Sequence, residues 1–363
     1  MDGARKSGVS ESILWMPAFV KELFRPDEEN EALIDGLLIR HPVYNEIMTA
    51  LESLEGIPKA DLSEHCLLFM ADSRTGKTRL LKEYIRRRMP CWTNDGIRIP
   101  VLYVLVREAP TVKSLSRLLL KEFNEKPSRS DTADDLFDRI VTLCINTGVR
   151  CICFDDLHNT IDKNGNVTHY AITTWMKNLA TLASLSIVGA GLDRTEELIV
   201  KNEQLYNRFD SPLHMPRLDW RIEDHQKCFR GIVRELYKSF ERDFELNDQD
   251  KTDPFRWYVA SGARIGIVVK IARHAVLTAR RKGQNFLDRN SFNEAWKKAS
   301  FKSTRTPEGE RPFGPCFESV ATDEAIVRVM AAGHEDAPNK ARRSPRKLTN
   351  RDKKAAVRNA MCR

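Results

Sequence analysis

No apolar run in this chain of 363 residues approaches the length of a membrane span. The first residues, Met1–Lys6, are not followed by the apolar core of a signal peptide, so we expect a cytosolic protein of bacterial type. The eight cysteines form no C-x-x-C pair, which argues against a metal site. Cys151 and Cys153 lie in an apolar run and are expected to be reduced, buried, and on the same side of a strand.

Most of the chain also lacks a net charge. The whole sequence carries +8, but the segment from Pro338 to Arg363 alone holds ten Lys/Arg and one Asp, a net +9. The remaining 337 residues hold 49 basic and 50 acidic side chains, a net −1. A nucleic-acid surface on the folded body must therefore come from local clustering of basic residues. The tail has too few apolar residues to fold alone.

The strongest motif is the stretch Ala71–Thr78, with the sequence ADSRTGKT. Before it, Cys66–Met70 predicts a buried strand, and after it, Arg79–Met89 predicts a helix. A loop between such elements holds polyphosphate with its backbone N–H groups and the helix N-terminus. The alternative is a chance Gly-Lys-Thr at a helix start. We expect ATP at the loop residues Ala71, Asp72, Ser73, Arg74, Thr75, Gly76, Lys77 and Thr78.

Within this loop, Lys77 is expected to reach the β- and γ-phosphates, and the Thr78 hydroxyl to bind Mg²⁺. Ala71 stands where the motif normally has its first glycine, and alanine disfavours positive φ. A second apolar run, Arg150–Asp156, ends in two carboxylates, as expected of a Walker-B strand. Asp155 would then orient Mg²⁺, and Asp156 would stand where a glutamate usually polarises water. The alternative is a solvated acidic turn.

In the rest of the chain, predicted strands first alternate with helices, and after Pro216 only helices are predicted. Further strands are predicted at Ile97–Val106 and Leu185–Gly189, with helices at Val112–Phe123, Thr132–Asn146 and Ala171–Ala183. This alternation predicts an α/β fold, a parallel sheet with helices on both faces. After Pro216 the pattern predicts helices only, at Arg221–Phe240, Pro254–Ala260, Arg264–Lys282 and Asp288–Ala299. A P-loop NTPase core followed by a small helical lid is the AAA+ plan.

The expected domains follow from these changes. They are an apolar N-terminal docking segment at 1–38, an AAA+ nucleotide-binding core at 39–218, a C-terminal helical lid at 219–302, and a basic, largely disordered tail at 303–363.

The phosphate loop and five further short motifs, in this order, make the region from Ile39 to Ala299 resemble the TniB/TnsC family of transposition ATPases, which choose target DNA for a transposase. The five further motifs are Asp155–Asn159 (DDLHN), Ala190–Leu192 (AGL), Gln204–Phe209 (QLYNRF), Met215–Trp220 (MPRLDW) and Gly262–Gly266 (GARIG). Three positions depart from the family pattern, namely Ala71, Asp156 and the usual polar sensor, which is Leu192 here. These departures favour a slow or partner-stimulated ATPase.

The resemblance implies ATP and Mg²⁺ as cofactors and a homo-oligomer, ring or filament, on double-stranded DNA. It also implies a transposase and a TniQ-like target-selection protein as partners. By the same resemblance, Arg208 is an arginine finger that reaches the next subunit's nucleotide, and Arg264 is a lid sensor of the γ-phosphate. The residue-level alternatives are an ion-paired Arg208 at the core edge and a surface Arg264.

Other classes of protein share parts of this pattern. The all-helical end leaves no room for the second α/β domain of a helicase and does not suit a small-molecule kinase. A replication-initiator-like AAA+ ATPase shares the core but usually adds a winged-helix domain, for which residues after Ala299 are too few. An ATP-binding scaffold with little turnover stays open because of Asp156 and Leu192.

Overall fold

The computed structural model describes residues 41–162, 166–240, 243–246, 252–300, 311–314 and 321–331, together with Pro17 and Phe317. Apart from Pro17, the N-terminal docking segment expected at 1–38 lies outside these residues, as does the basic tail from Pro338 onward. Within the described parts, every helix is too short or too polar to span a bilayer.

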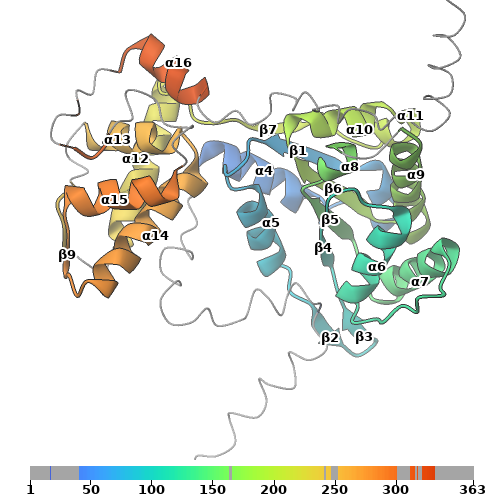
Figure 1. Ribbon diagram of the computed structural model, residues 1–363. Coiled ribbons are helices and arrows are strands. Elements are labelled where there is room, and N and C mark those ends of the chain that lie inside the picture. The colour runs from blue at the N-terminus through green and yellow to red at the C-terminus, as the bar shows by residue number, and fades with distance from the viewer. Residues whose placement is uncertain are drawn as a thin grey trace, which may run out of the picture.

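A five-stranded parallel sheet organises the first part of the chain, as the sequence predicts (Figure 1). Its order is β4-β5-β6-β1-β7, with neighbouring strands in parallel register, for example Leu67 opposite Val188 and Val101 opposite Cys151. The carboxyl ends of parallel strands lie at one edge of the sheet, which brings the residues after β1, β5 and β6 together. The strands are β1 Leu67–Ala71, β4 Val101–Leu105, β5 Cys151–Asp155, β6 Ser186–Gly191 and β7 Leu213–Met215.

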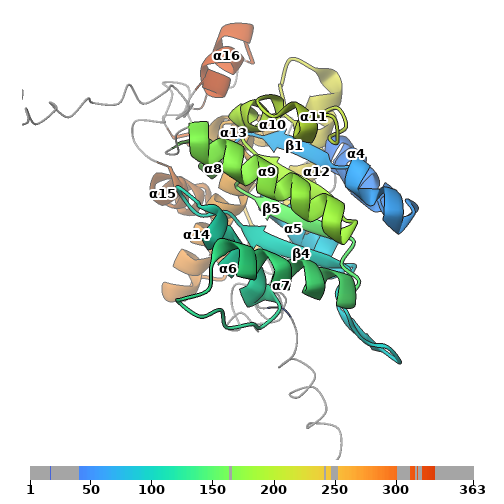
Figure 2. The same cartoon turned by 90° about the vertical axis from the view of Figure 1, so that its right-hand side faces the viewer.

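Helices cover both faces of this sheet. One hydrophobic cluster joins β4, β5 and β6 to α6, α7 and α9, and Figure 2 shows these helices from outside. The cluster on the other face joins the sheet to α4 and α5. Successive residues of β5 alternate between the clusters, so the buried Cys151 and Cys153 share a side, as expected. These helices are α4 Pro42–Ser53, α5 Lys77–Arg86, α6 Val112–Glu122, α7 Ala133–Asn146 and α9 Asn166–Ala183.

Short elements complete the α/β core near the edges of the sheet. Among them, Asn202 caps α11 by accepting a hydrogen bond from the backbone N–H of Leu205. The elements are η1 Lys59–Glu64, α8 Asn159–Asp162, η2 Asp193–Thr195, α10 Glu196–Val200 and α11 Glu203–Tyr206.

The single strand predicted at Ile97–Val106 is wrong, because the chain forms two strands there. Pro100 has no backbone N–H to donate and separates β3 Gly96–Arg98 from β4. β3 pairs with β2 Cys91–Thr93 as an antiparallel hairpin, on which the Trp92 side chain is 62% exposed. β7 was not predicted, because three residues are too few to show a periodic pattern.

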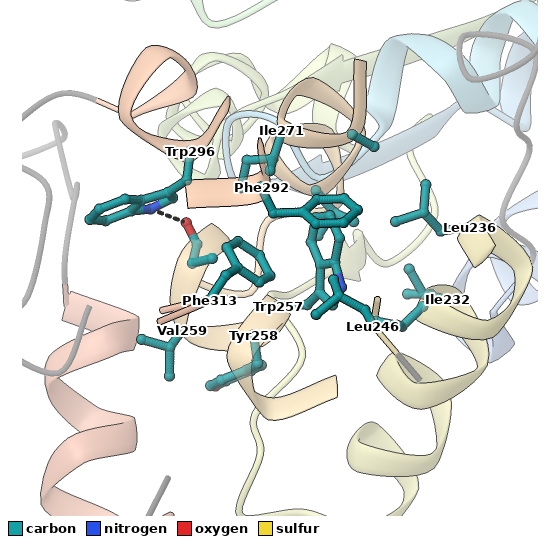
Figure 3. Close-up of a cluster of buried hydrophobic side chains, with 14 of the residues drawn as sticks. Ile232, Leu236, Leu246, Trp257, Tyr258, Val259, Ile271, Phe292, Trp296 and Phe313 are labelled. Atoms are coloured by element: carbon teal, nitrogen blue, oxygen red, sulfur yellow. Dashed lines mark hydrogen bonds between the residues drawn. The ribbon is translucent and has the colours of Figure 1, made fainter. Parts of the chain in front are cut away.

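The second part of the chain is a helical module, the lid, as expected. Its aromatic core is drawn in Figure 3, where the Trp296 indole N–H donates to the Ala260 carbonyl at 3.1 Å. Within the same core the Trp257 indole N–H donates to the Tyr237 hydroxyl at 2.8 Å, so the buried polar ends of these rings are satisfied. The lid consists of α12 Glu223–Lys238, α13 Asp253–Ser261, α14 Ile265–Arg281, α15 Arg289–Ala299, α16 Asp323–Ala331, and the short strands β8 Asp243–Phe244 and β9 Phe286–Leu287.

The lid core extends past residue 302, the boundary expected from the sequence. Phe313, Ile326 and Val329 are all buried in it. The buried Arg256 donates to the carbonyls of Pro312 at 3.0 Å and Gly314 at 2.7 Å. The apolar run on α16 is therefore part of the lid's packing.

Candidate nucleotide site

The phosphate loop lies at the carboxyl edge of the sheet, between β1 and α5. Arg74 has φ 64° and Gly76 has φ 116°, so the chain turns through left-handed conformations before the helix begins. Any residue with a side chain at position 76 would have a strained backbone at that φ angle. Ala71, by contrast, is the last residue of β1 and pairs with Met215 of β7. Because the position is extended strand, alanine replaces the motif's first glycine without backbone strain.

Lys77 begins α5 and its side chain is buried beneath the loop. Its Nζ donates to the carbonyl of Ala71 at 2.5 Å and to that of Asp72 at 3.0 Å. Burial lowers the pKa of Lys77, while nearby carboxylates, with Asp156 first and Asp155 second, act to raise it. The ammonium group thus lies inside the curve of the loop, where a polyphosphate would meet it.

Thr78 and Asp155 meet directly, as the magnesium prediction requires. The Thr78 hydroxyl donates to Asp155 Oδ2 at 2.7 Å, although the two residues are 77 positions apart. The carboxylate also accepts from the Tyr103 hydroxyl at 2.9 Å and, at Oδ1, from the Asp156 N–H at 2.9 Å. Burial raises the pKa of Asp155, and the bonds from Thr78 and Tyr103 oppose that rise. A hydroxyl and a carboxylate beside a phosphate loop are the oxygen donors that suit Mg²⁺.

Tyr103 was not recognised from the sequence. It lies on β4, the neighbour of β5, and its hydroxyl fixes one oxygen of Asp155. The available signal was a lone tyrosine in an otherwise aliphatic strand, because a buried hydroxyl needs a polar partner.

A cavity of about 470 Å³ opens beside the loop. Asp156 projects to it with φ 53° and a side chain that is 38% exposed, so the carboxylate is accessible to water. His158 Nδ1 lies 4.0 Å from Asp156 Oδ1. Leu192, at the expected sensor position, presents an apolar side chain. The cavity is lined by Ser73, Arg74, Gly76, Lys77, Thr78, Arg79, Asp156, His158, Leu192 and Gly266.

The lid contacts the phosphate loop directly. At the start of α14, the Gly266 N–H donates to the Arg74 carbonyl at 2.8 Å. A Cβ on Gly266 would lie 2.9 Å from that carbonyl oxygen, so only glycine allows this approach. Arg264, the predicted sensor, is the residue that precedes α14, two positions before Gly266, and it is not among the residues that line the cavity. Its sensing role stays a prediction.

Arg217 makes a second connection that sequence reasoning missed. Its side chain is only 2% exposed, and Nε donates to Asp72 Oδ2 at 2.5 Å. Nη1 lies 3.5 Å from the Gly262 carbonyl at the end of α13. One buried guanidinium therefore joins the phosphate loop to the lid. The signal in the sequence was a cation inside the apolar connection MPRLDW, where a buried charge needs a partner.

Arg208 lies elsewhere in the same chain. Nη1 donates to the Ser63 carbonyl at 2.9 Å and to Glu64 Oε1 at 2.8 Å. Its backbone carbonyl accepts from the Cys66 N–H at 2.7 Å, which places it at the amino end of β1, away from the phosphate loop. Within one chain the structure therefore has the ion-paired arrangement. A role in a neighbouring subunit's site stays a prediction.

The sheet, the phosphate loop, the Thr78–Asp155 pair and the helical lid define the AAA+ P-loop ATPase class. Solved structures of that class agree. The chain matches the Aeropyrum pernix ORC2 protein in its ADPNP–ADP complexes with TM-score 0.57 and 15% identity over 76% of this chain and 73% of that one. It matches Cdc6p from Pyrobaculum aerophilum with TM-score 0.55 and 11% identity over 75% and 72%. These likenesses show the fold.

The family is shown by the sequence. Residues 32–219, more than half of the chain, match the family model described as Bacterial TniB protein, and the chain belongs to the TniB family. No curated protein matches the chain. Family and fold together support a transposition-associated AAA+ ATPase.

Proposed function

We propose that this protein is an ATP-dependent regulator of transposition that oligomerises on target DNA, recruits a transposase and disassembles on ATP hydrolysis. The observation that carries the proposal is the extent of the TniB match. Residues 32–219 include the phosphate loop, Asp155, Arg208 and Arg217, so the family region is also the nucleotide-binding region. A TniQ-like target-selection protein would be a further partner.

In this proposal the loop binds ATP with its backbone N–H groups, and Lys77 turns from the carbonyls of Ala71 and Asp72 to the β- and γ-phosphates. Thr78 and Asp155 would hold Mg²⁺, whose positive charge would offset the negative charge of the phosphates. Asp156 accepts the proton of the attacking water. Because its carboxylate is one methylene shorter than glutamate, turnover in the isolated subunit is slow.

Two arginines complete the proposed site, one from the neighbouring subunit and one from the lid. Arg208 of one subunit leaves its contact with Glu64 and reaches the γ-phosphate of its neighbour, where it stabilises the transferring phosphoryl group. Arg264, at the start of α14, senses the γ-phosphate from the lid. The second candidate is a scaffold that binds ATP without turnover, which the apolar Leu192 at the sensor position favours.

Measured ATPase rates separate these candidates. Phosphate release is followed for the protein alone, with duplex DNA, and with DNA plus the transposase, using Lys77→Ala as the control. A slow basal rate that rises with both partners supports the regulator. Nucleotide binding with no release above the Lys77→Ala background in any mixture leaves the scaffold.

A further inference from the structure

The second half of α14 is basic and has no acidic residue. From Ile265 to Leu287 the chain contains no Asp or Glu. The apolar side of α14 is fixed by burial in the lid core, since Val268, Ile271 and Ala275 are all inaccessible to solvent. Its polar residues therefore point away from the core, as the period of a helix requires.

Five side chains gather on this side, and we name them the basic lid face. The charges of Lys270, Lys298, Arg273 and Arg281 all act on His274 and, after burial, lower its pKa. Lys298 comes from the neighbouring α15, and its Nζ donates to the Thr278 hydroxyl of α14 at 3.3 Å. The basic lid face consists of Lys270, Arg273, His274, Arg281 and Lys298.

Three cations of the cluster have no carboxylate partner in the part of the chain that the structure describes. Lys270 Nζ donates to a neutral acceptor, the Ala299 carbonyl at 3.0 Å. Lys270, Arg281 and Lys298 form no ion pair with a described carboxylate, whereas the adjacent Lys282 pairs with Glu294 at 3.1 Å. Like charges held this close repel one another, so a bound polyanion would relieve the repulsion.

The shape of the cluster favours a nucleic-acid backbone. Lys270 and Arg281 are eleven residues apart on one helix, about 16 Å along its axis. Duplex DNA carries a phosphate every 3.4 Å or so on each strand, so a straight row of cations of this length spans several phosphates. Contacts from lysine and arginine to phosphate oxygens position a protein on the duplex and carry no sequence information.

We propose that the basic lid face binds the phosphate backbone of duplex DNA without sequence preference. The inference rests on the proposed function and deepens it, because it names residues for the DNA contact. Gly266, in the first turn of α14, is bonded to the phosphate loop at Arg74, so one helix joins the DNA contact to the nucleotide site.

The test uses the full chain, a 30-base-pair fluorescent duplex and an ATP analogue, with affinity measured by anisotropy over a series of salt concentrations. The variant is Arg281→Gln/Lys298→Gln, since both residues are exposed. The control, Lys227→Gln/Lys238→Gln, removes the same charge from α12 of the same lid, where both lysines are ion-paired. Each lost phosphate contact lowers the slope of log affinity against log salt by about 0.9.

For the variant, the slope of log affinity against log salt should therefore be smaller in magnitude by about 2, and binding at 50 mM salt should be up to about a hundredfold weaker. The control should match the parent, and both should bind the ATP analogue and melt as the parent does. Equal slopes for variant and parent, or an equal loss in the control, overturn the proposal. If the variant binds DNA normally but loses the transposase, an acidic protein occupies the face instead. A parent that binds no duplex overturns the proposed function as well.

Discussion

The connection between Arg217 and Asp72 gives the most quantitative prediction about the site. Removing either partner leaves the other charge without its counter-charge, and such changes to buried pairs cost about 3–5 kcal/mol of unfolding free energy. The two partners are not equally buried. The Arg217 side chain is 2% exposed, while that of Asp72 is 25% exposed and can be hydrated.

Asp72→Asn should therefore lower the unfolding free energy by about 3–5 kcal/mol, because it leaves the more deeply buried guanidinium without its carboxylate. Arg217→Met fills similar space and leaves a carboxylate that water can reach, so its cost should be about 1–3 kcal/mol. The double variant, which has no charge left at either position, should cost less than the sum of the two. For a folded unit of this size, each kcal/mol lowers Tm by about 2–4 °C.

The assays are urea unfolding and affinity for an ATP analogue, measured on the parent, both single variants and the double variant. Because the pair fixes the phosphate loop against the lid, nucleotide affinity should fall in both single variants. Arg221→Met is the control, since Arg221 pairs with Asp219 in the same connection but is 44% exposed. Equal stability of all variants, or a greater cost for Arg217→Met than for Asp72→Asn, would refute this reasoning.

Four further predictions concern the rest of the molecule. Lys77→Ala should abolish ATP binding in equilibrium dialysis; undiminished affinity would show that the site is assigned wrongly. An Arg208→Ala subunit mixed with a Lys77→Ala subunit should regain some ATPase activity, and no recovery in confirmed mixed oligomers would count against a role in trans. His41 caps α4 by accepting a hydrogen bond from the Tyr44 N–H at 3.2 Å. Burial, with His225 nearby, lowers the pKa of His41 to about 4, so the unfolding free energy should fall by about 2–4 kcal/mol as the pH drops from 6.5 to 4. His41→Asn, which keeps the helix cap, should remove most of that loss in urea titrations. Truncation after Ala337 should weaken DNA binding at low salt or the transposase response and spare ATP binding; loss of ATP binding, or no change in either response, would contradict this.

The sequence predicted the parts of the fold that have a strong local pattern. The apolar runs at Cys66–Met70 and Arg150–Asp156 became β1 and β5, within a residue or two at each end. The contact between Thr78 and Asp155 follows from the shared edge of a parallel sheet, which the alternation of strands and helices already implies.

What the sequence could not supply depends on packing between distant segments. Phe313 and Val329 join the lid core from beyond a stretch of low hydrophobicity, and no local pattern shows that the apolar run of α16 packs there. The buried pair of Arg217 and Asp72 joins residues 145 positions apart, and no periodicity reports such a contact. The approach of Gly266 to the phosphate loop likewise depends on the placement of α14, which a lone glycine does not reveal.

The central claim is that nucleotide in the Ala71–Thr78 loop controls assembly on DNA. Electron microscopy of the purified protein with duplex DNA, in the presence of an ATP analogue and in its absence, tests it most directly. The account predicts regular rings or filaments along the duplex with the analogue, and none without nucleotide or with Lys77→Ala. Monomers on DNA at micromolar protein with the analogue bound, or the same assemblies without any nucleotide, would contradict it.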